Sequence, residues 1–167
     1  MRLILLPVLS LSFACVAQEG GNPFAGLQAQ QVASGFKFTE GPVWLKEGYW
    51  LFSDIPANRI YKLVPGGKAE VWRADSGQSN GLTLDREGRL IACEHHNRRV
   101  SRTEADGTIT VLAETLGGKR FHSPNDVTVR RDGMVFFTDP TYGLAKREKE
   151  LGFKGVYMVK PGAEPVV

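Results

Sequence analysis

Short apolar runs separated by turn residues make up the chain from about Phe38 onward. The runs have the length of strands and are rich in β-branched and aromatic residues, which favours β-strands over helices. Between them stand short Gly-, Asp- and Pro-containing segments that tolerate the backbone angles of hairpin turns, such as 65–67, 87–88 and 132–133. The pattern predicts an all-β protein with strands over residues 49–52, 59–64, 69–72, 81–84, 89–92, 108–112, 127–129 and 134–137.

The strand pattern repeats along the chain. Residues 80–91 align with residues 125–136 without a gap, 45 positions later. An earlier copy begins at Glu40, and the acidic ends of corresponding strands, Asp54, Glu94 and Asp139, are 40 and 45 residues apart. Such a period in a strand-rich sequence is typical of propeller blades, each a four-stranded antiparallel sheet.

The length of the repeat region limits the number of blades. Residues 38–167 span 130 residues, which at this period is three blades. Because a propeller ring closes with about four to eight blades, we expect about three four-stranded blades here, and a ring that continues past Val167. The third copy also contains an insertion, 142–155, whose charged segment 146–150 is interpreted as a solvated loop or one helical turn.

The N-terminus differs from the rest. Arg2 precedes an apolar run of about 15 residues that ends at Ala17, short of the roughly 20 residues that a membrane-spanning helix needs. We predict a secretory signal peptide over 1–17 with cleavage near Ala17, a linker over 18–36, and the partial propeller over 37–167. The protein would then be secreted or periplasmic, with no membrane association beyond the signal segment. The alternatives are an uncleaved anchor and a lipoprotein attached through Cys15.

Charge and cysteine content narrow the function classes. With 21 Lys and Arg residues against 18 Asp and Glu residues, the net charge is only +3, and no basic run argues for nucleic acid. Removal of the signal peptide leaves Cys93 alone, so no intramolecular disulfide can form. Cys93 lies in an apolar strand, which favours a buried structural cysteine over a catalytic thiol.

Polar residues in tight turns open each copy of the repeat: Glu40, Asn80 and Asn125. Equivalent positions of successive blades surround the central channel of a propeller, so these side chains could converge there. Their oxygens suit a hard divalent cation, whereas the scarcity of Cys and His argues against a zinc site. The alternative for each Asn is a side chain that caps its own turn, but Glu is not a turn former.

Two further segments could line the same channel. His95 follows the strand end at Glu94, although a surface position is an equal alternative. The stretch 119–126 is densely polar and could supply a base, a cation or a metal ligand. Arg120, His95 and Asp126 are therefore the candidate substrate-binding residues.

Five motifs occur in order at residues 38–44, 51–56, 79–82, 123–127 and 137–143. Together they resemble the gluconolactonase family, which includes the senescence marker protein and the luciferin-regenerating enzyme. The resemblance implies a six-bladed propeller with a divalent cation, usually Ca²⁺, at one end of the channel, and hydrolysis of sugar lactones; Mg²⁺, Mn²⁺ or Zn²⁺ are alternatives. Glu40 falls on the family's metal-binding Glu, and Asn125 on an Asn that contacts the metal or the substrate.

The resemblance also implies that part of the site is missing. The family's later Asn-Gly motif and its later Asp-Gly motif, whose Asp is the presumed general base, have no counterpart before Val167, and Asn80 stands one blade too early. The leading hypothesis is a metal-dependent lactone hydrolase that acts on a small-molecule lactone and is inactive as this chain alone. The alternatives are a non-catalytic binding module, a half-propeller that pairs with another chain, and self-association through open blade edges.

Overall fold

The computed structural model describes residues 25–144 and 148–167. The chain divides into two compact units, Met1–Gln31 and Val32–Val167, and every strand of the described residues belongs to the second. The predicted signal peptide, its cleavage at Ala17 and the Cys15 alternative lie outside the described residues. Within those residues, no helix has the length and apolar character needed to cross a membrane.

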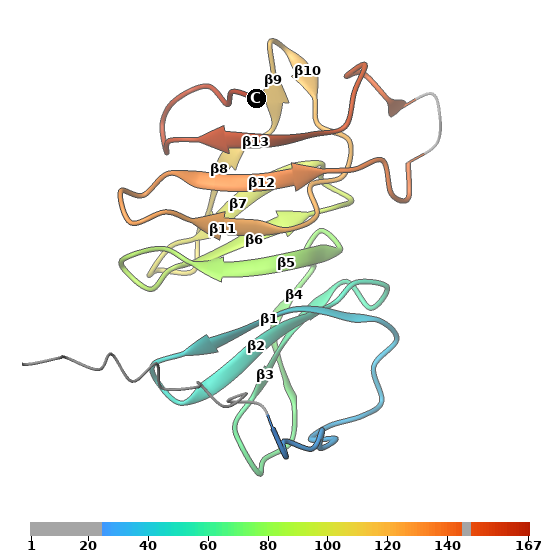
Figure 1. The fold of residues 1–167 in the computed structure, drawn as a ribbon, viewed down its shortest axis with the longest axis vertical. Coiled ribbons are helices and arrows are strands. Elements are labelled where there is room, and N and C mark those ends of the chain that lie inside the picture. The colour runs from blue at the N-terminus through green and yellow to red at the C-terminus, as the bar shows by residue number, and fades with distance from the viewer. Residues whose placement is uncertain (1–24, 145–147) are drawn as a thin grey trace, which may run out of the picture. The chain divides into compact units, whose positions relative to one another are not determined.

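The second unit is built from antiparallel sheets that follow one another along the chain (Figure 1). Two sheets have four strands and a third has three, each in sequence order, which confirms the all-β propeller prediction. The third sheet is narrower than predicted, although Val166 extends it through a single bridge to Met158.

The first sheet contains β1 (Thr39–Leu45), β2 (Tyr49–Asp54), β3 (Arg59–Leu63) and β4 (Glu70–Ala74). The second contains β5 (Ser79–Leu84), β6 (Leu90–Glu94), β7 (Arg99–Thr103) and β8 (Ile109–Ala113). The third contains β11 (Val127–Val129), β12 (Val135–Asp139) and β13 (Gly155–Val159), and a small hairpin pairs β9 (Thr115–Leu116) with β10 (Lys119–Arg120).

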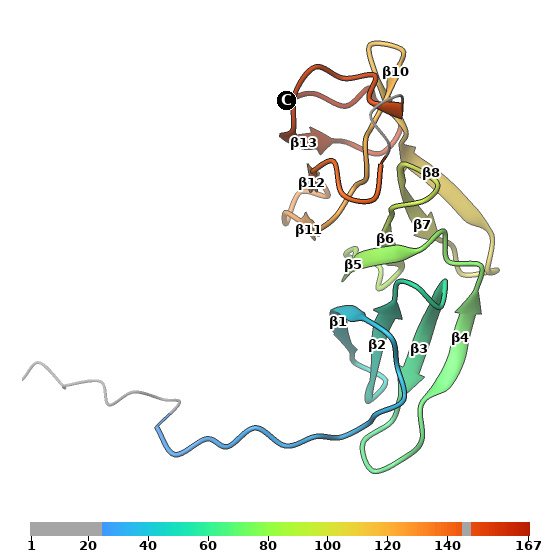
Figure 2. The same cartoon turned by 90° about the vertical axis from the view of Figure 1, so that its right-hand side faces the viewer.

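The sheets pack face to face through apolar side chains, as blades do. Between the first and second sheets, Leu51, Ile60 and Leu82 are buried in one cluster. Between the second and third sheets, a larger cluster includes Phe121 and Tyr157, whose rings meet edge to face at 4.9 Å between centroids. The first strands β1, β5 and β11 come together at one edge of this stack (Figure 2).

Cys93 is fully buried within the second cluster. Burial in apolar surroundings raises the pKa of its thiol well above the ordinary value, and nearby carboxylates act in the same direction. A thiol held in the neutral form is a poor nucleophile. The structure therefore confirms the interpretation of Cys93 as a buried core residue.

Glycine allows the first strands to approach one another closely. A Cβ on Gly81 would lie 2.7 Å from both the carbonyl oxygen of Asn125 and the Cα of Asp126. The same backbone makes a hydrogen bond across the blades, from the Gly81 N–H to the Asn125 carbonyl, at 2.8 Å. Gly41 has the same place in the first blade, where a Cβ would lie 2.7 Å from the backbone nitrogen of Leu82. These contacts hold the polar residues before each glycine close together.

The acidic residues that revealed the repeat are buried anchors. Asp54 accepts hydrogen bonds from the backbone N–H groups of Lys37 and Phe38, both at 3.0 Å. Asp139 accepts corresponding bonds from His122 and Ser123, at 2.8 and 2.7 Å. In both blades the carboxylate ties the segment that enters the first strand to the end of the second strand.

Glu94, at the corresponding position of the second blade, binds side chains instead. Its carboxylate is fully buried and pairs with Arg73 of β4 and Arg99 of β7, each at 2.7 Å. Ser101 and Asn97 donate further hydrogen bonds to it, at 2.5 and 2.6 Å. Because Arg73 belongs to the first blade, Glu94 also links the first two blades.

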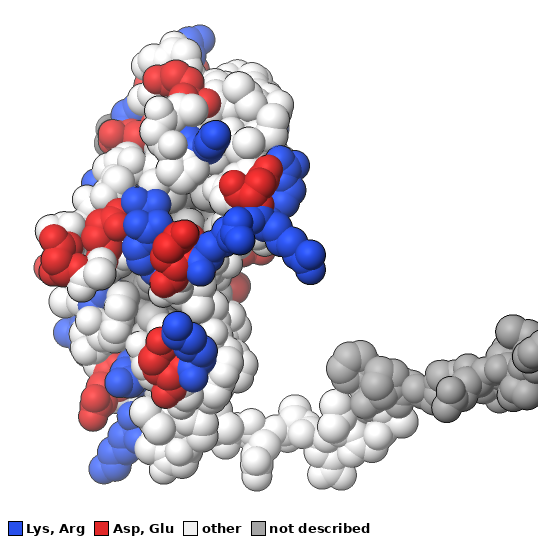
Figure 3. All heavy atoms as spheres, turned by 90° about the vertical axis from the view of Figure 1, so that its left-hand side faces the viewer, with Lys and Arg blue, Asp and Glu red and all other residues white. Residues whose placement is uncertain are grey.

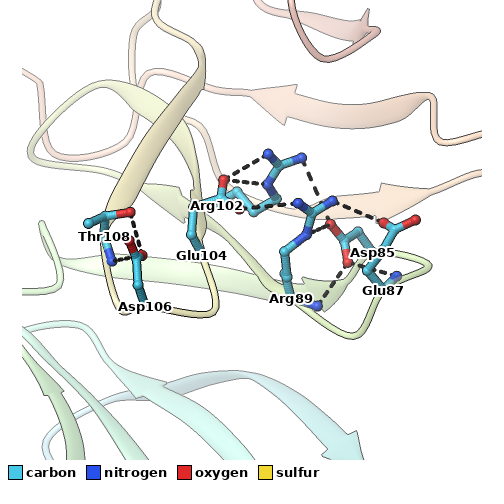
Figure 4. A network of polar contacts seen from close by, with 7 residues as sticks. All are labelled: Asp85, Glu87, Arg89, Arg102, Glu104, Asp106 and Thr108. Carbon is cyan, nitrogen blue, oxygen red and sulfur yellow. Dashed lines mark hydrogen bonds and ion pairs between the residues drawn. The ribbon is translucent and has the colours of Figure 1, made fainter.

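Partly buried ion pairs join the loops at the other end of the second blade (Figure 4). Arg89 pairs with Asp85 at 2.7 Å and with Glu104 at 3.1 Å, and Arg102 pairs with Glu104 at 2.7 Å. On the face drawn in Figure 3, basic and acidic side chains alternate. Their carboxylates are more exposed than that of Glu94, so solvent screens these pairs more strongly than it screens the Glu94 cluster.

The insertion in the third copy lies partly against the second blade. Leu151 is buried in the core cluster between the second and third sheets. Glu150 accepts a hydrogen bond from the Arg120 N–H at 2.9 Å and pairs with Arg98 at 3.2 Å. The end of the insertion is thus packed rather than fully solvated.

Candidate active site

Glu40, Asn80 and Asn125 line one pocket of about 250 Å³ where the first strands of the three blades meet. Irregular pairing of the first strands places Glu40 and Asn80 in this pocket. The pairing of β1 with β2 shifts register between Glu40 and Val43, and the pairing of β5 with β6 shifts between Ser79 and Leu82. A β-bulge redirects the side chains at the start of a strand, so the bulges place Glu40 and Asn80 at equivalent points of adjacent blades.

His95 connects the two asparagines. Its Nε2 atom lies 3.3 Å from Nδ2 of Asn80 and 3.3 Å from Nδ2 of Asn125. Burial lowers the pKa of His95 below its ordinary value, which favours the neutral ring. Asn80 is itself buried, and its backbone carbonyl accepts a hydrogen bond from the Ser53 hydroxyl of β2 at 2.9 Å.

A second, more polar pocket of about 370 Å³ adjoins His95. It is lined by Arg98, Arg120 and Tyr142 along with His95 and His96. The Arg120 guanidinium is held by the Asn97 carbonyl at 2.8 Å and lies 3.4 Å from Glu114. This pocket offers cationic and neutral hydrogen-bond donors, a set that suits an oxygen-rich small molecule.

The structure brings the residues singled out from the sequence into two adjoining places. Glu40, Asn125 and Asp126 share the first pocket, and Arg120 and His95 share the second. Asp126 is exposed, and its Oδ1 accepts a hydrogen bond from the N–H of Val127 at 2.9 Å. Their roles as metal ligands or substrate contacts stay predictions.

The family resemblance does not count Asn80 among the metal-binding residues, but the structure places it in the same pocket as Glu40 and Asn125. The repeat had already placed it in the ring with Glu40 and Asn125, and it lines their pocket. The link from His95 to both amides carries no sequence signal, since residues 80, 95 and 125 are distant along the chain.

The donor set of the first pocket fits part of the shell of a hard cation. Each amide directs its nitrogen toward His95, so the carbonyl oxygen on the other branch of the amide is left for another partner. One carboxylate and two amide oxygens match the ligands of Ca²⁺, which takes about six to eight oxygens. In the part of the chain that the structure describes, no three His, Cys, Asp or Glu side chains gather as a metal cluster, so any cation here would rely on the amides and on further ligands.

A sequence model of the SMP-30/gluconolactonase/LRE-like region matches residues 38–167, which includes all three blades. The chain belongs to this family. The chain is also similar to a gluconolactonase of Zymomonas mobilis subsp. mobilis, with 32% identity over 149 residues; the match covers 78% of this chain and 42% of that protein.

Two solved structures of gluconolactonases resemble the chain in sequence and fold. A gluconolactonase from Xanthomonas campestris is 34% identical with a TM-score of 0.71; the match covers 78% of this chain and 46% of that one. A structural-genomics target assigned as a gluconolactonase is 37% identical with a TM-score of 0.74, covering 82% of this chain and 50% of that one. The chain thus spans about half the length of the relatives that it matches.

A more distant structure supports the fold alone. Virginiamycin B lyase from Staphylococcus aureus is 17% identical to the chain with a TM-score of 0.55, and the match covers 77% of this chain and 40% of that one. At this identity the likeness extends to the arrangement of strands and not to chemistry.

Proposed function

We propose that this chain forms three blades of a metal-dependent hydrolase of sugar lactones. The observation that carries the proposal is that Glu40, Asn80 and Asn125, one residue from each blade, line one pocket. Membership of the family and the gluconolactonase relatives support the lactone as substrate class. The most suitable cation is Ca²⁺, because the donors are hard oxygens.

We assign cation binding to the first pocket and lactone binding to the second. Glu40 and the two amides would hold the cation, which when bound supplies Lewis acidity toward a carbonyl oxygen. Arg120 and Tyr142, which line the adjoining pocket, would bind the hydroxyl and carbonyl groups of a lactone. The family resemblance assigns the general base to an Asp of a later blade, so we propose that the site becomes complete only with further blades.

The end faces of the stack support the need for further blades. On the first sheet, Phe36, Trp50, Phe52 and Leu63 line an apolar pocket of about 420 Å³. On the third sheet, Phe136 and the exposed Val156 line another, of about 150 Å³. We propose that additional blades of the same polypeptide cover both faces, as the blades described here cover one another. The alternatives are a second chain that closes the ring, and a non-catalytic module.

The test compares gluconolactone hydrolysis by two forms of the protein, one ending at Val167 and one extended through the reading frame that follows it. We expect the extended form to hydrolyse the lactone, to lose this activity on chelation and to regain it with Ca²⁺, whereas the shorter form is inactive. Hydrolysis that chelation does not change would contradict the metal dependence. An extended form that folds but does not hydrolyse the lactone would favour the binding module.

A further inference from the structure

We propose that His95 is a positioning residue that orients Asn80 and Asn125 together through a single ring nitrogen, so that both amide oxygens turn toward Glu40. The use of these oxygens as cation ligands rests on the proposed function. The orientation itself rests on the hydrogen bonds in the structure and can be tested without a cation.

The geometry of the amides carries the first step. His95 Nε2 lies 3.3 Å from the Nδ2 atoms of Asn80 and Asn125. A carboxamide is planar, with nitrogen and oxygen on opposite branches, so an amide that points its nitrogen at His95 points its oxygen away. The same two residues line the pocket that contains Glu40. One imidazole nitrogen thereby sets the orientation of two side chains from adjacent blades.

The tautomer of His95 decides which atoms face the pocket. With the proton on Nδ1, the lone pair of Nε2 accepts from both amides, and both oxygens remain for a cation. With the proton on Nε2, the ring would instead donate to an amide oxygen, and that amide would present its nitrogen to the pocket. An amide nitrogen carries no lone pair suited to a metal, so this arrangement would remove a ligand.

The surroundings of His95 hold its backbone in place. The preceding residue is Glu94, whose buried carboxylate is fixed by Arg73 and Arg99. The N–H of Arg98 donates to the His95 carbonyl at 3.2 Å, and the N–H of His96 donates to the Gly77 carbonyl at 2.9 Å. Because this segment is held in place, the His95 ring can fix the orientation of the two amides that are hydrogen-bonded to it.

The first experiment determines the tautomer in the unmodified chain. Long-range ¹⁵N–¹H spectra of the histidine rings at neutral pH distinguish a protonated Nδ1 from a protonated Nε2. We expect His95 to be protonated on Nδ1, with Nε2 as a hydrogen-bond acceptor. Protonation on Nε2 would overturn the proposal, whether or not the protein binds a cation.

The second experiment replaces the ring. In His95→Phe, which keeps an aromatic ring without a nitrogen, we expect the side-chain amide signals of Asn80 and Asn125 to shift and the Ca²⁺ affinity to fall by about 10–100-fold, the usual cost of losing a residue that orients a ligand. His96→Phe is the matched control, since His95 and not His96 makes the hydrogen bonds to the two amides, and it should change neither the amide signals nor the Ca²⁺ affinity. His95→Gln, whose carbonyl oxygen can accept a hydrogen bond, should restore part of the affinity.

The outcomes separate the two proposals. Unchanged amide signals in a folded His95→Phe variant, checked by its backbone spectrum, would overturn the role of His95. If the amide signals of the unmodified chain and of an extended form both fail to respond to Ca²⁺, the cation site of the proposed function fails. The tautomer and the amide shifts then still decide the orienting role.

Discussion

Replacing Glu40 with Gln is expected to lower both Ca²⁺ affinity and lactone hydrolysis by at least about 100-fold. Loss of a residue that only orients a metal ligand costs about 10–100-fold, and loss of a direct ligand should cost at least as much as the upper value. Glu40 is the carboxylate residue of the first blade that lines the same pocket as Asn80 and Asn125. The substitution removes the negative charge and retains the size of the side chain. Calcium titration followed by calorimetry measures the affinity, and gluconolactone turnover by the extended form measures the activity.

Glu47→Gln is the matched control for this prediction. Glu47 is exposed in the turn between β1 and β2, and its loss removes the same charge from the same blade. We expect the control to leave affinity and turnover unchanged. Equal losses in both variants would show that overall charge, rather than a ligand at Glu40, controls the cation.

Replacing Glu94 with Ala is expected to lower the free energy of unfolding by about 3–5 kcal/mol, the cost of breaking a buried ion pair by removing one partner. The substitution leaves Arg73 and Arg99 without their buried carboxylate and removes an acceptor from Ser101. Urea unfolding measures the change. Glu87→Ala, which removes an exposed partner of Arg89, should change the free energy by no more than about 0.5 kcal/mol.

The contribution of Glu94 to the free energy of unfolding is expected to depend on pH. Burial alone would raise the pKa of Glu94, but hydrogen bonds from Ser101, Arg99, Asn97 and Arg73 outweigh it and lower the pKa below its ordinary value of 4.5. A lowered pKa in the folded state means that the contribution of Glu94 is fully present above the unfolded value and is lost as the pH falls through the folded value. Glu94→Gln should therefore differ most from the parent protein near neutral pH and approach it in acid. A difference that stays constant down to low pH would contradict the ionised cluster.

The repeat made the fold predictable, because each blade buries the same positions of its strands. Strand β7 was missed because Arg99–Thr103 contains a single large apolar residue, Val100, and its arginines bind the carboxylates of Glu94 and Glu104. A strand whose polar groups are satisfied by neighbouring strands has no apolar alternation to detect. The hairpin of β9 and β10 has only two residues in each strand, too few for a pattern.

The site was predictable only as far as the repeat extends. Equivalent positions in successive blades predicted that Glu40, Asn80 and Asn125 could meet, and they line one pocket. The sequence showed Asp54, Glu94 and Asp139 as repeated acids, but not that two of them bind backbone N–H groups and one binds arginines. These differences depend on distant partners, which a local pattern does not contain.

The central claim is that side chains from three blades form one cation site, and anomalous scattering tests it most directly. Crystals of the protein soaked with Mn²⁺, which accepts the same oxygen ligands and scatters anomalously, would locate the ion without reference to activity. We predict a peak bonded to the Glu40 carboxylate and to an amide oxygen of Asn125, with the Asn80 oxygen directed at it. Well-ordered crystals in which the ion lies elsewhere, or in which the Glu40 carboxylate points out of the pocket, would contradict the account.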